Sequence, residues 1–181
     1  MGLNPDGSSQ PGSRPVQQVP PLAPDEMVAA AGERAILEAF LELQRAVVVR
    51  KVYGLTREQA VRRLVPSLTT LAGLLRHLAA VEQEWFGRIL AGDPDRPGPP
   101  DEWLPGPDEG IADLIAGYRR ACARSRQIAT ALSLDDAVPH PRLGTVTLRW
   151  IYVHMIEETA RHAGQADILR EQTDGATGFD G

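Results

Sequence analysis

The sequence has a single cysteine, Cys122, among its 181 residues, so no disulfide can form within the chain. This scarcity favours a reduced, cytoplasmic setting. No run of about 18 apolar residues occurs, so no transmembrane helix is expected. The first residues also lack the basic stretch and following apolar stretch of a secretory signal. These absences together predict a cytoplasmic protein that does not enter the membrane.

Basic residues are in deficit, and lysine is almost missing. The formal net charge is −5 and the pI is about 5.4. This balance argues against nucleic-acid binding, which usually needs a basic face. Lys51 is the only lysine, and all other basic residues are arginine. With abundant Ala, Gly and Pro, this bias is typical of a GC-rich bacterial genome.

The chain is long enough for one domain with a hydrophobic core. Residues 1–24 are rich in Pro, Gly, Ser and Gln. They have too little apolar surface to offset the entropy lost on ordering, so a disordered tail is predicted there. One folded domain is expected over residues 25–178. It contains no internal repeats and no convincing alternation typical of strands.

Apolar residues recur at helical spacing in most of this domain. The pattern predicts four long helices and one short one, over residues 25–51, 67–90, 111–131, 148–171 and 57–64. Thr56 and Gln59 have the form of a capping box for the short helix, and Ser67 is a candidate cap for the next. The segments 92–107 and 133–147 are predicted loops. The fold class is therefore all-α, a four-helix bundle, and the long loops permit an up-down-down-up route.

The last predicted helix has polar side chains inside its apolar seam. Steps of three and four residues along it pass through Leu148, Ile151, Met155, Glu158, His162, Gln165 and Leu169. Burying an unpaired carboxylate costs several kcal/mol. Glu158 therefore needs a partner, which could be an arginine such as Arg161, a hydrogen-bond network or a metal ion.

A metal ion would explain the spacing of these polar residues. Glu158 and His162 are four residues apart, so they share one helical face and can bind two positions of one cation. His77 lies among leucines of the second long helix and could supply a third ligand, because bundle metal sites use inward side chains of facing helices. His154 lies one turn further back. The alternative is that His77 is an ordinary hydrogen-bonded histidine and that Glu158 pairs with arginine.

Four stretches of the chain resemble the DinB superfamily of bundle metalloproteins and occur in the same order. They are FLELQRAVVVRKVYGLTREQ, LLRHLAAVEQEWF, YRRACARSR and LRWIYVHMIEETARHAGQADILRE. The resemblance runs from about Asp25 to Gly178 and is strongest to the actinobacterial branch, whose members are similar to mycothiol-dependent enzymes.

The resemblance implies a divalent metal held by His77, Glu158 and His162. Zinc is the expected ion, with nickel, iron and manganese as alternatives. Many relatives have histidine in place of Glu158, but relatives similar to mycothiol-dependent maleylpyruvate isomerase share this His, Glu, His set. Gln165 stands where close relatives often carry histidine, so it is a doubtful ligand. The isomerase has an extra C-terminal domain, so isomerase activity is not expected here.

Three protein ligands would leave coordination positions open, as in catalytic zinc sites. A thiol bound there would lose its proton, although free thiols have a pKa of about 8.5. The resemblance names mycothiol as the thiol and implies transfer to a small electrophile, in detoxification or secondary metabolism. Arg76 and Arg161 could hold a carboxylate or a sugar-linked thiol, although pairing with nearby acids is the simpler interpretation. His154 could support or replace a ligand.

Two other functions stay open: a hydrolase whose metal activates water, and a non-catalytic bundle that binds a metal or ligand. Trp85, Trp103 and Trp150 could wall a pocket but are as easily core residues. His140, between two prolines, is expected to be exposed. Cys122 is interpreted as a small buried hydrophobe rather than a nucleophile. Exposed apolar residues of the first helix could serve a homodimer.

Overall fold

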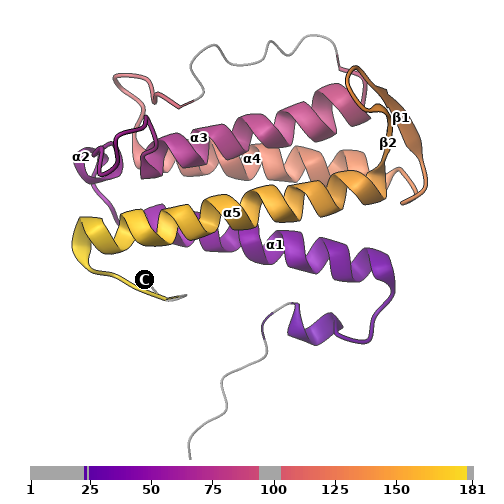
Figure 1. Ribbon diagram of the computed structural model, residues 1–181, viewed down its shortest axis with the longest axis horizontal. Coiled ribbons are helices and arrows are strands. Elements are labelled where there is room, and N and C mark those ends of the chain that lie inside the picture. Colours follow the sequence, from indigo (N-terminus) through magenta and orange to yellow (C-terminus); the bar gives the residue numbers. More distant parts are fainter. Residues whose placement is uncertain (1–22, 24, 94–102, 179–181) are drawn as a thin grey trace, which may run out of the picture.

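Four long helices dominate the computed structural model, which describes residues 23, 25–93 and 103–178 (Figure 1). They are α1 (Glu33–Val52), α3 (Leu71–Glu82) with its π-helical continuation η2 (Gln83–Leu90), α4 (Ile111–Thr130) and α5 (Leu148–Asp174). The smaller elements are η1 (Glu26–Val28), α2 (Arg57–Ala60), β1 (Ala137–His140) and β2 (Gly144–Thr147). The predicted helical bundle is confirmed, whereas the predicted tail lies outside the described residues except for Ala23. No described helix is long and apolar enough to cross a membrane.

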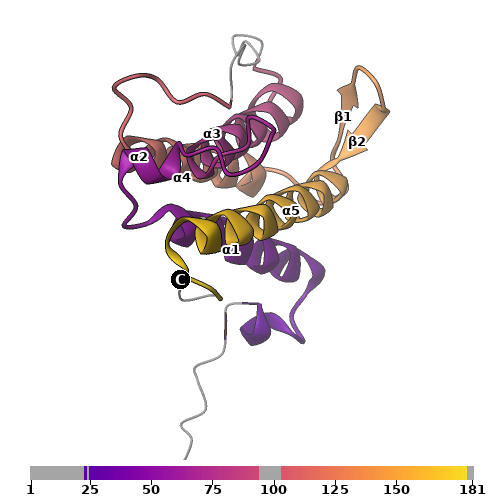
Figure 2. The same cartoon turned by 60° about the vertical axis from the view of Figure 1, so that its left-hand side comes forward.

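The chain follows the up-down-down-up route. Arg149 near the start of α5 pairs with Glu33 at the start of α1, and Asp167 near the end of α5 pairs with Lys51. α1 and α5 are therefore parallel. Arg34 donates hydrogen bonds to carbonyls at the end of α4, so α4 runs opposite to α1. Figures 1 and 2 both show α3 beside α4 in one pair and α5 beside α1 in the other.

The core is divided along the bundle axis into two apolar clusters. One is built around Leu74, Leu75 and Leu78 of α3, and the other around Leu148 and Met155 of α5. Each of these side chains is almost fully buried, which contributes about 1.5–3 kcal/mol per leucine or methionine. This packing holds α3 against α5, the two helices that carry the candidate metal ligands.

Three helix boundaries differ from the prediction by four or more residues. α1 begins at Glu33 rather than residue 25, because the backbone of Gly32 is extended and caps the helix. The short helix has a true capping box at Thr56 but ends at Ala60 instead of residue 64. The second long helix starts after Thr70, whose hydroxyl accepts a hydrogen bond from the amide of Gly73. Ser67 is therefore not its cap.

The predicted loop 133–147 contains a short antiparallel hairpin, so the expectation of no strands is wrong. Pro139 of β1 pairs in register with Thr145 of β2. Gly144 has a φ of +77°, which suits glycine at the end of the turn. The hairpin stands at the beginning of α5 and projects from the bundle (Figure 2). It brings His140 onto the α3–α5 side of the molecule.

Candidate metal centre

The structure brings His77 of α3 together with Glu158 and His162 of α5. The Nε2 atom of each imidazole lies 3.1 Å from Oε1 of Glu158. Ligand atoms of the three residues all lie within 4.8 Å of one another. The side chains of His77, Glu158 and His162 are 13%, 15% and 10% exposed. The triad is thus largely shielded but still reachable from solvent.

The packing of α5 explains why these polar groups sit at the edge of the core. Thr159 and Ala163, the residues that follow Glu158 and His162, are buried toward the bundle interior. Adjacent residues of an α-helix point about 100° apart around its axis, so Glu158 and His162 lie at the edge of the core, on the side of α5 that faces α3. The heptad seam placed Glu158 deeper in the core than it is, whereas His162 is buried as the seam predicted. The border position leaves them accessible to a small molecule.

Gln165 fixes the tautomer of His162. Nδ1 of His162 lies 2.8 Å from Oε1 of Gln165. An amide oxygen only accepts hydrogen bonds, so Nδ1 must carry the proton. In the neutral imidazole, Nε2 then directs a lone pair at the carboxylate of Glu158. Two such electron-rich atoms 3.1 Å apart need a cation between them, either a proton or a metal ion.

The distances between the donor atoms fit a divalent ion. Bonds of about 2.0–2.1 Å in a tetrahedral zinc site place donor atoms roughly 3.3 Å apart. The two nitrogen–oxygen separations of 3.1 Å are close to that value. The imidazoles of His77 and His162 meet edge to face, with ring centroids 4.7 Å apart. All three donor atoms lie within 4.8 Å of one another, so side-chain rotation could bring them onto one ion.

The surroundings of Glu158 favour its charged form. Burial opposes ionisation, but the hydrogen bonds and charges of His77 and His162 outweigh it and lower the pKa of Glu158. The carboxylate therefore stays ionised well below neutral pH. An anionic oxygen between two imidazoles is a donor set that suits a divalent cation.

A family model described as Mycothiol-S-transferase matches residues 36–175, which is well over half of the chain. The chain belongs to the mycothiol-S-transferase family. This family is part of the DinB-like superfamily, so the resemblance seen in the sequence is confirmed at that level. No curated protein and no solved structure gives a significant match.

An aromatic ring, the indole of Trp103, covers one side of the triad. The indole of Trp103 stacks on the imidazole of His77, with centroids 4.4 Å apart and planes 11° from parallel. The close approach depends on Gly73, because a Cβ there would lie 2.7 Å from the carbonyl oxygen of Trp103. Sequence reasoning named Trp103 only as a potential pocket wall, since contact between a loop and a helix leaves no periodic signal.

Replacing Gly73 with alanine is expected to displace Trp103 from His77. The added methyl group meets backbone, which cannot rotate away, so we expect a loss of about 1–3 kcal/mol of folding free energy. Gly164→Ala is the matched control, because this helical glycine has nothing within 4 Å of its added Cβ. It should stabilise the protein by about 0.5–1 kcal/mol. Urea unfolding and the NMR shifts of the His77 ring protons test both; unchanged His77 shifts in Gly73→Ala would contradict the prediction.

The arginines beside the triad pair with acids, as the simpler interpretation held. Arg76 donates to Glu109 at 2.6 Å. Arg161 pairs with Glu157, and its Nη1 atom lies 4.0 Å from Oε2 of Glu158. Arg161 is more than half exposed, so it can leave Glu157 for a ligand at low cost.

His154 and His140 lie apart from the triad. His154 packs between Trp85 and Trp150, and His140 stacks on Trp85, so it is not simply exposed. Cys122 is buried, as predicted, and burial raises its pKa to about 12. A thiol with that pKa is not a nucleophile at neutral pH.

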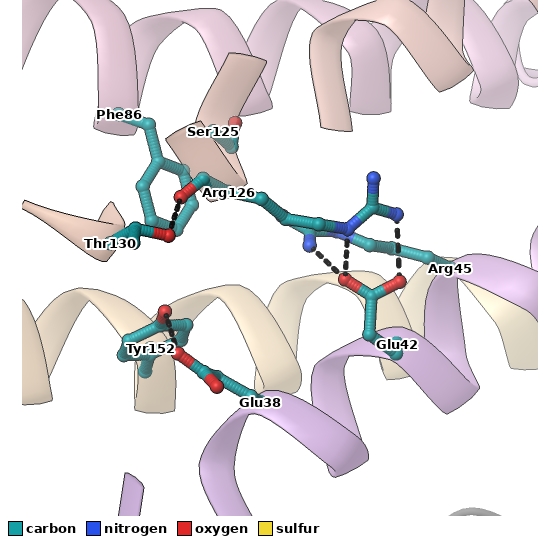
Figure 3. A pocket seen from close by; sticks show the side chains of 8 residues that line it. All are labelled: Glu38, Glu42, Arg45, Phe86, Ser125, Arg126, Thr130 and Tyr152. Atoms are coloured by element: carbon teal, nitrogen blue, oxygen red, sulfur yellow. Dashed lines mark hydrogen bonds and ion pairs between the residues drawn. The ribbon is translucent and has the colours of Figure 1, made fainter. Parts of the chain in front are cut away.

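A second site of interest is the cavity of about 210 Å³ between α1 and α4 (Figure 3). Its acidic side chains are already satisfied by the protein's own donors. Glu42 accepts two hydrogen bonds from Arg126, and Glu38 accepts one from the hydroxyl of Tyr152. Among the described residues, only His77, Glu158 and His162 form a three-residue group suited to a metal. The triad is therefore the candidate functional site.

Proposed function

We propose that this protein is a metal-dependent thiol S-transferase that uses mycothiol. His77, Glu158 and His162 hold a divalent cation, with zinc the expected ion. The acceptor is a small electrophile, as in detoxification or secondary metabolism. Membership of the mycothiol-S-transferase family supports the choice of thiol and reaction.

The observation that carries the proposal is the convergence of two imidazole nitrogens on one oxygen of Glu158, each at 3.1 Å. Gln165 holds His162 in the tautomer that turns a lone pair toward this point. A histidine that only fills space in the core is not expected to direct a ring nitrogen at a carboxylate that a second histidine also contacts. The donor set, two neutral nitrogens and one anionic oxygen, is that of a catalytic site with open coordination positions.

A divalent cation held by His77, Glu158 and His162 would lower the pKa of a bound thiol and so would supply a thiolate at neutral pH. The thiolate sulfur would form a bond to the electrophilic carbon, and the leaving group would depart with its electron pair. Glu158 would act as an anionic ligand rather than a base, because its carboxylate would be committed to the cation. The proton of the thiol is therefore released to water.

The surrounding residues position and shield the reacting atoms. Gln165 fixes the orientation of His162, and Trp103 excludes water from the exposed face of His77. Arg161, near Glu158 and largely in solvent, offers a bidentate donor to a polar group of the thiol. Each of these residues acts on binding and geometry, not on bond making.

The direct test combines elemental analysis with a transfer assay on protein purified without a metal-affinity column. We expect one equivalent of metal per chain and conjugation of mycothiol to iodoacetamide above the uncatalysed rate. Treatment with a chelator should abolish the catalysed rate, and zinc should restore it.

The same assay separates the alternative functions. Turnover of an amide or ester without added thiol would identify a hydrolase. Bound metal with no turnover of either kind would identify a binding module. Thiol transfer that persists in metal-free protein would overturn the proposed role of the triad.

A further inference from the structure

An aromatic cluster lies on the same side of the bundle as the triad, toward the hairpin. It consists of Trp85 of η2, His140 of β1, and Trp150 and His154 of α5. His154 stacks on Trp150 with centroids 5.1 Å apart and meets Trp85 edge to face at 4.5 Å. His140 stacks on Trp85 at 5.2 Å. Three separate elements thus bring four rings into contact.

This aromatic cluster lies at the surface edge of the hydrophobic interior, against which Trp85 packs. Trp150 is 41% exposed, and the rings of Trp85, His140 and His154 are half-buried. Large apolar rings that gather at a surface commonly mark a binding site. Trp85 also lies in a π-helical segment, and such segments are frequent at functional sites.

The aromatic cluster continues directly from the triad. His154 precedes Glu158 by four residues, which places the two about 6 Å apart along α5. Trp150 lies one further turn away, about 12 Å from Glu158. Trp85 follows His77 by eight residues along α3 and η2. These helices run antiparallel to α5, so Trp85 lies on the same side of the triad as His154 and Trp150. A molecule lying on the cluster can therefore extend to the triad.

The two directions away from the triad differ in chemistry. Toward the hairpin lie the rings of the aromatic cluster. In the opposite direction along α5 lies the amide of Gln165, while Arg161 and the ion pair of Arg76 with Glu109 flank the triad itself. A sugar-linked thiol needs hydrogen-bonding groups and charges, which the polar part supplies.

We infer that the aromatic cluster is the binding site for the electrophile, and that it selects a flat, electron-poor aromatic ring whose reactive carbon points toward the triad, one to two helical turns away along α5. This inference rests on the proposed function, because it assigns the acceptor of the same transfer. Indole faces are electron-rich, so they stack best with rings depleted of electrons. Electrophiles that react with thiolates are commonly conjugated to such rings.

The first test measures binding without chemistry. N-(4-nitrophenyl)acetamide has the ring but no leaving group, so it cannot react. Calorimetric titration should show saturable binding to the native protein and an affinity about three- to ten-fold weaker in Trp150→Ala, the range expected for one stacking contact. Ile168→Ala, an exposed apolar residue of α5 outside the cluster, should bind as the native protein does. Equal affinity in Trp150→Ala and the native protein would overturn the inference.

The second test uses two acceptors with the same reaction. Iodoacetamide and its N-(4-nitrophenyl) derivative both form an S–CH₂ bond as iodide leaves with the electron pair, and the thiol proton goes to water. We expect a higher kcat/KM for the derivative, and a three- to ten-fold fall in that preference in Trp150→Ala. Metal content should stay constant in this variant. An unchanged preference with constant metal content would refute the aromatic cluster as acceptor site.

The failures of the two proposals are distinguishable. Absence of thiol transfer with both acceptors would refute the proposed function, while the calorimetric test would still decide whether the cluster binds an electron-poor ring. Transfer with both acceptors but no binding difference would leave the function intact and reject the cluster.

Discussion

Replacing His162 with alanine is expected to empty the metal centre and abolish thiol transfer. His162 supplies one of only two nitrogen donors in the triad, and its Nε2 atom lies 3.1 Å from Glu158. Loss of a residue that merely orients a ligand weakens metal binding by about 10–100-fold. Loss of the ligand itself should exceed 100-fold by the same reasoning. Elemental analysis after dialysis and the transfer rate with mycothiol measure the two effects.

Two variants make this result specific. Glu157 is the exposed neighbour of Glu158, and its carboxylate pairs with Arg161. The Glu157→Ala variant should therefore keep its full metal content. His162→Gln retains a side chain of similar reach without an imidazole, and guards against a folding defect caused by truncation. Circular dichroism should show the native helical content in all variants. Native metal content in both His162 variants would refute the triad as a metal site.

Replacing Gln165 is expected to weaken metal binding less than replacing His162, because Gln165 orients a ligand and is not one. Its replacement by alanine leaves all three donors in place but releases Nδ1 of His162. The imidazole then loses its fixed tautomer, so metal affinity should fall by about 10–100-fold. Competition with a chromophoric chelator measures this affinity. Glutamate at this position should restore binding, because a carboxylate oxygen also accepts from Nδ1.

Helical periodicity predicted the bundle because the apolar residues that recur along α3, α4 and α5 are the ones that pack against one another in the core. The third and fourth long helices were placed within one to three residues of their observed ends. The beginning of α1 was missed, because alanines before Gly32 are good helix formers and hide the break. Ser67, Thr69 and Thr70 all have capping side chains, so residue type alone cannot select Thr70.

The hairpin was hidden by its own composition. Pro139 and Pro141 interrupt the alternation that would mark β1, and proline is tolerated there only because this two-stranded sheet consists of edges. The pairing itself links residues on both sides of a turn. A pattern confined to one segment could not reveal it, nor the contact of His140 with Trp85.

The triad was predictable because polar residues stood in an apolar seam and matched a family pattern. The positions of Glu158 and His162 on one face follow from their spacing, but their contact with His77, 81 residues away from Glu158, depends on how α3 faces α5. The stacking of Trp103 and the aromatic cluster also depend on contacts between elements. Such contacts carry no local signature, so the sequence could name these rings without assigning their partners.

A buried ion pair between α1 and α3 was missed for the same reason. Arg45 donates from Nε and Nη2 to the two carboxylate oxygens of Glu82, at 2.7 and 2.6 Å. The side chains are 6% and 1% exposed. Burial opposes the charge of Arg45, but Glu82 outweighs it and raises the pKa of the guanidinium. Arg45 also donates from Nη1 to Glu42, at 2.7 Å, beside the cavity (Figure 3).

Removing Glu82 should therefore destabilise the fold strongly. Glu82→Ala leaves the buried guanidinium of Arg45 with Glu42 as its remaining acidic partner, so the loss should approach the roughly 3–5 kcal/mol that an uncompensated buried charge costs. The double variant Arg45→Met, Glu82→Leu removes both charges and should recover most of that loss, because apolar replacements of buried pairs are often neutral. Urea unfolding monitored by circular dichroism measures all three proteins.

The control for this prediction is Arg126→Ala, which breaks an exposed pair with Glu42 and should cost less than about 1 kcal/mol. Glu82 stands where α3 passes into η2, five residues after His77. Loss of the pair should thus also loosen the placement of His77 and lower metal affinity, whereas the apolar double variant should regain both stability and metal. A Glu82→Ala variant no less stable than Arg126→Ala would show that the pair does not fix α3 against α1. A double variant as unstable as Glu82→Ala would show that packing volume, not charge, is what the site requires.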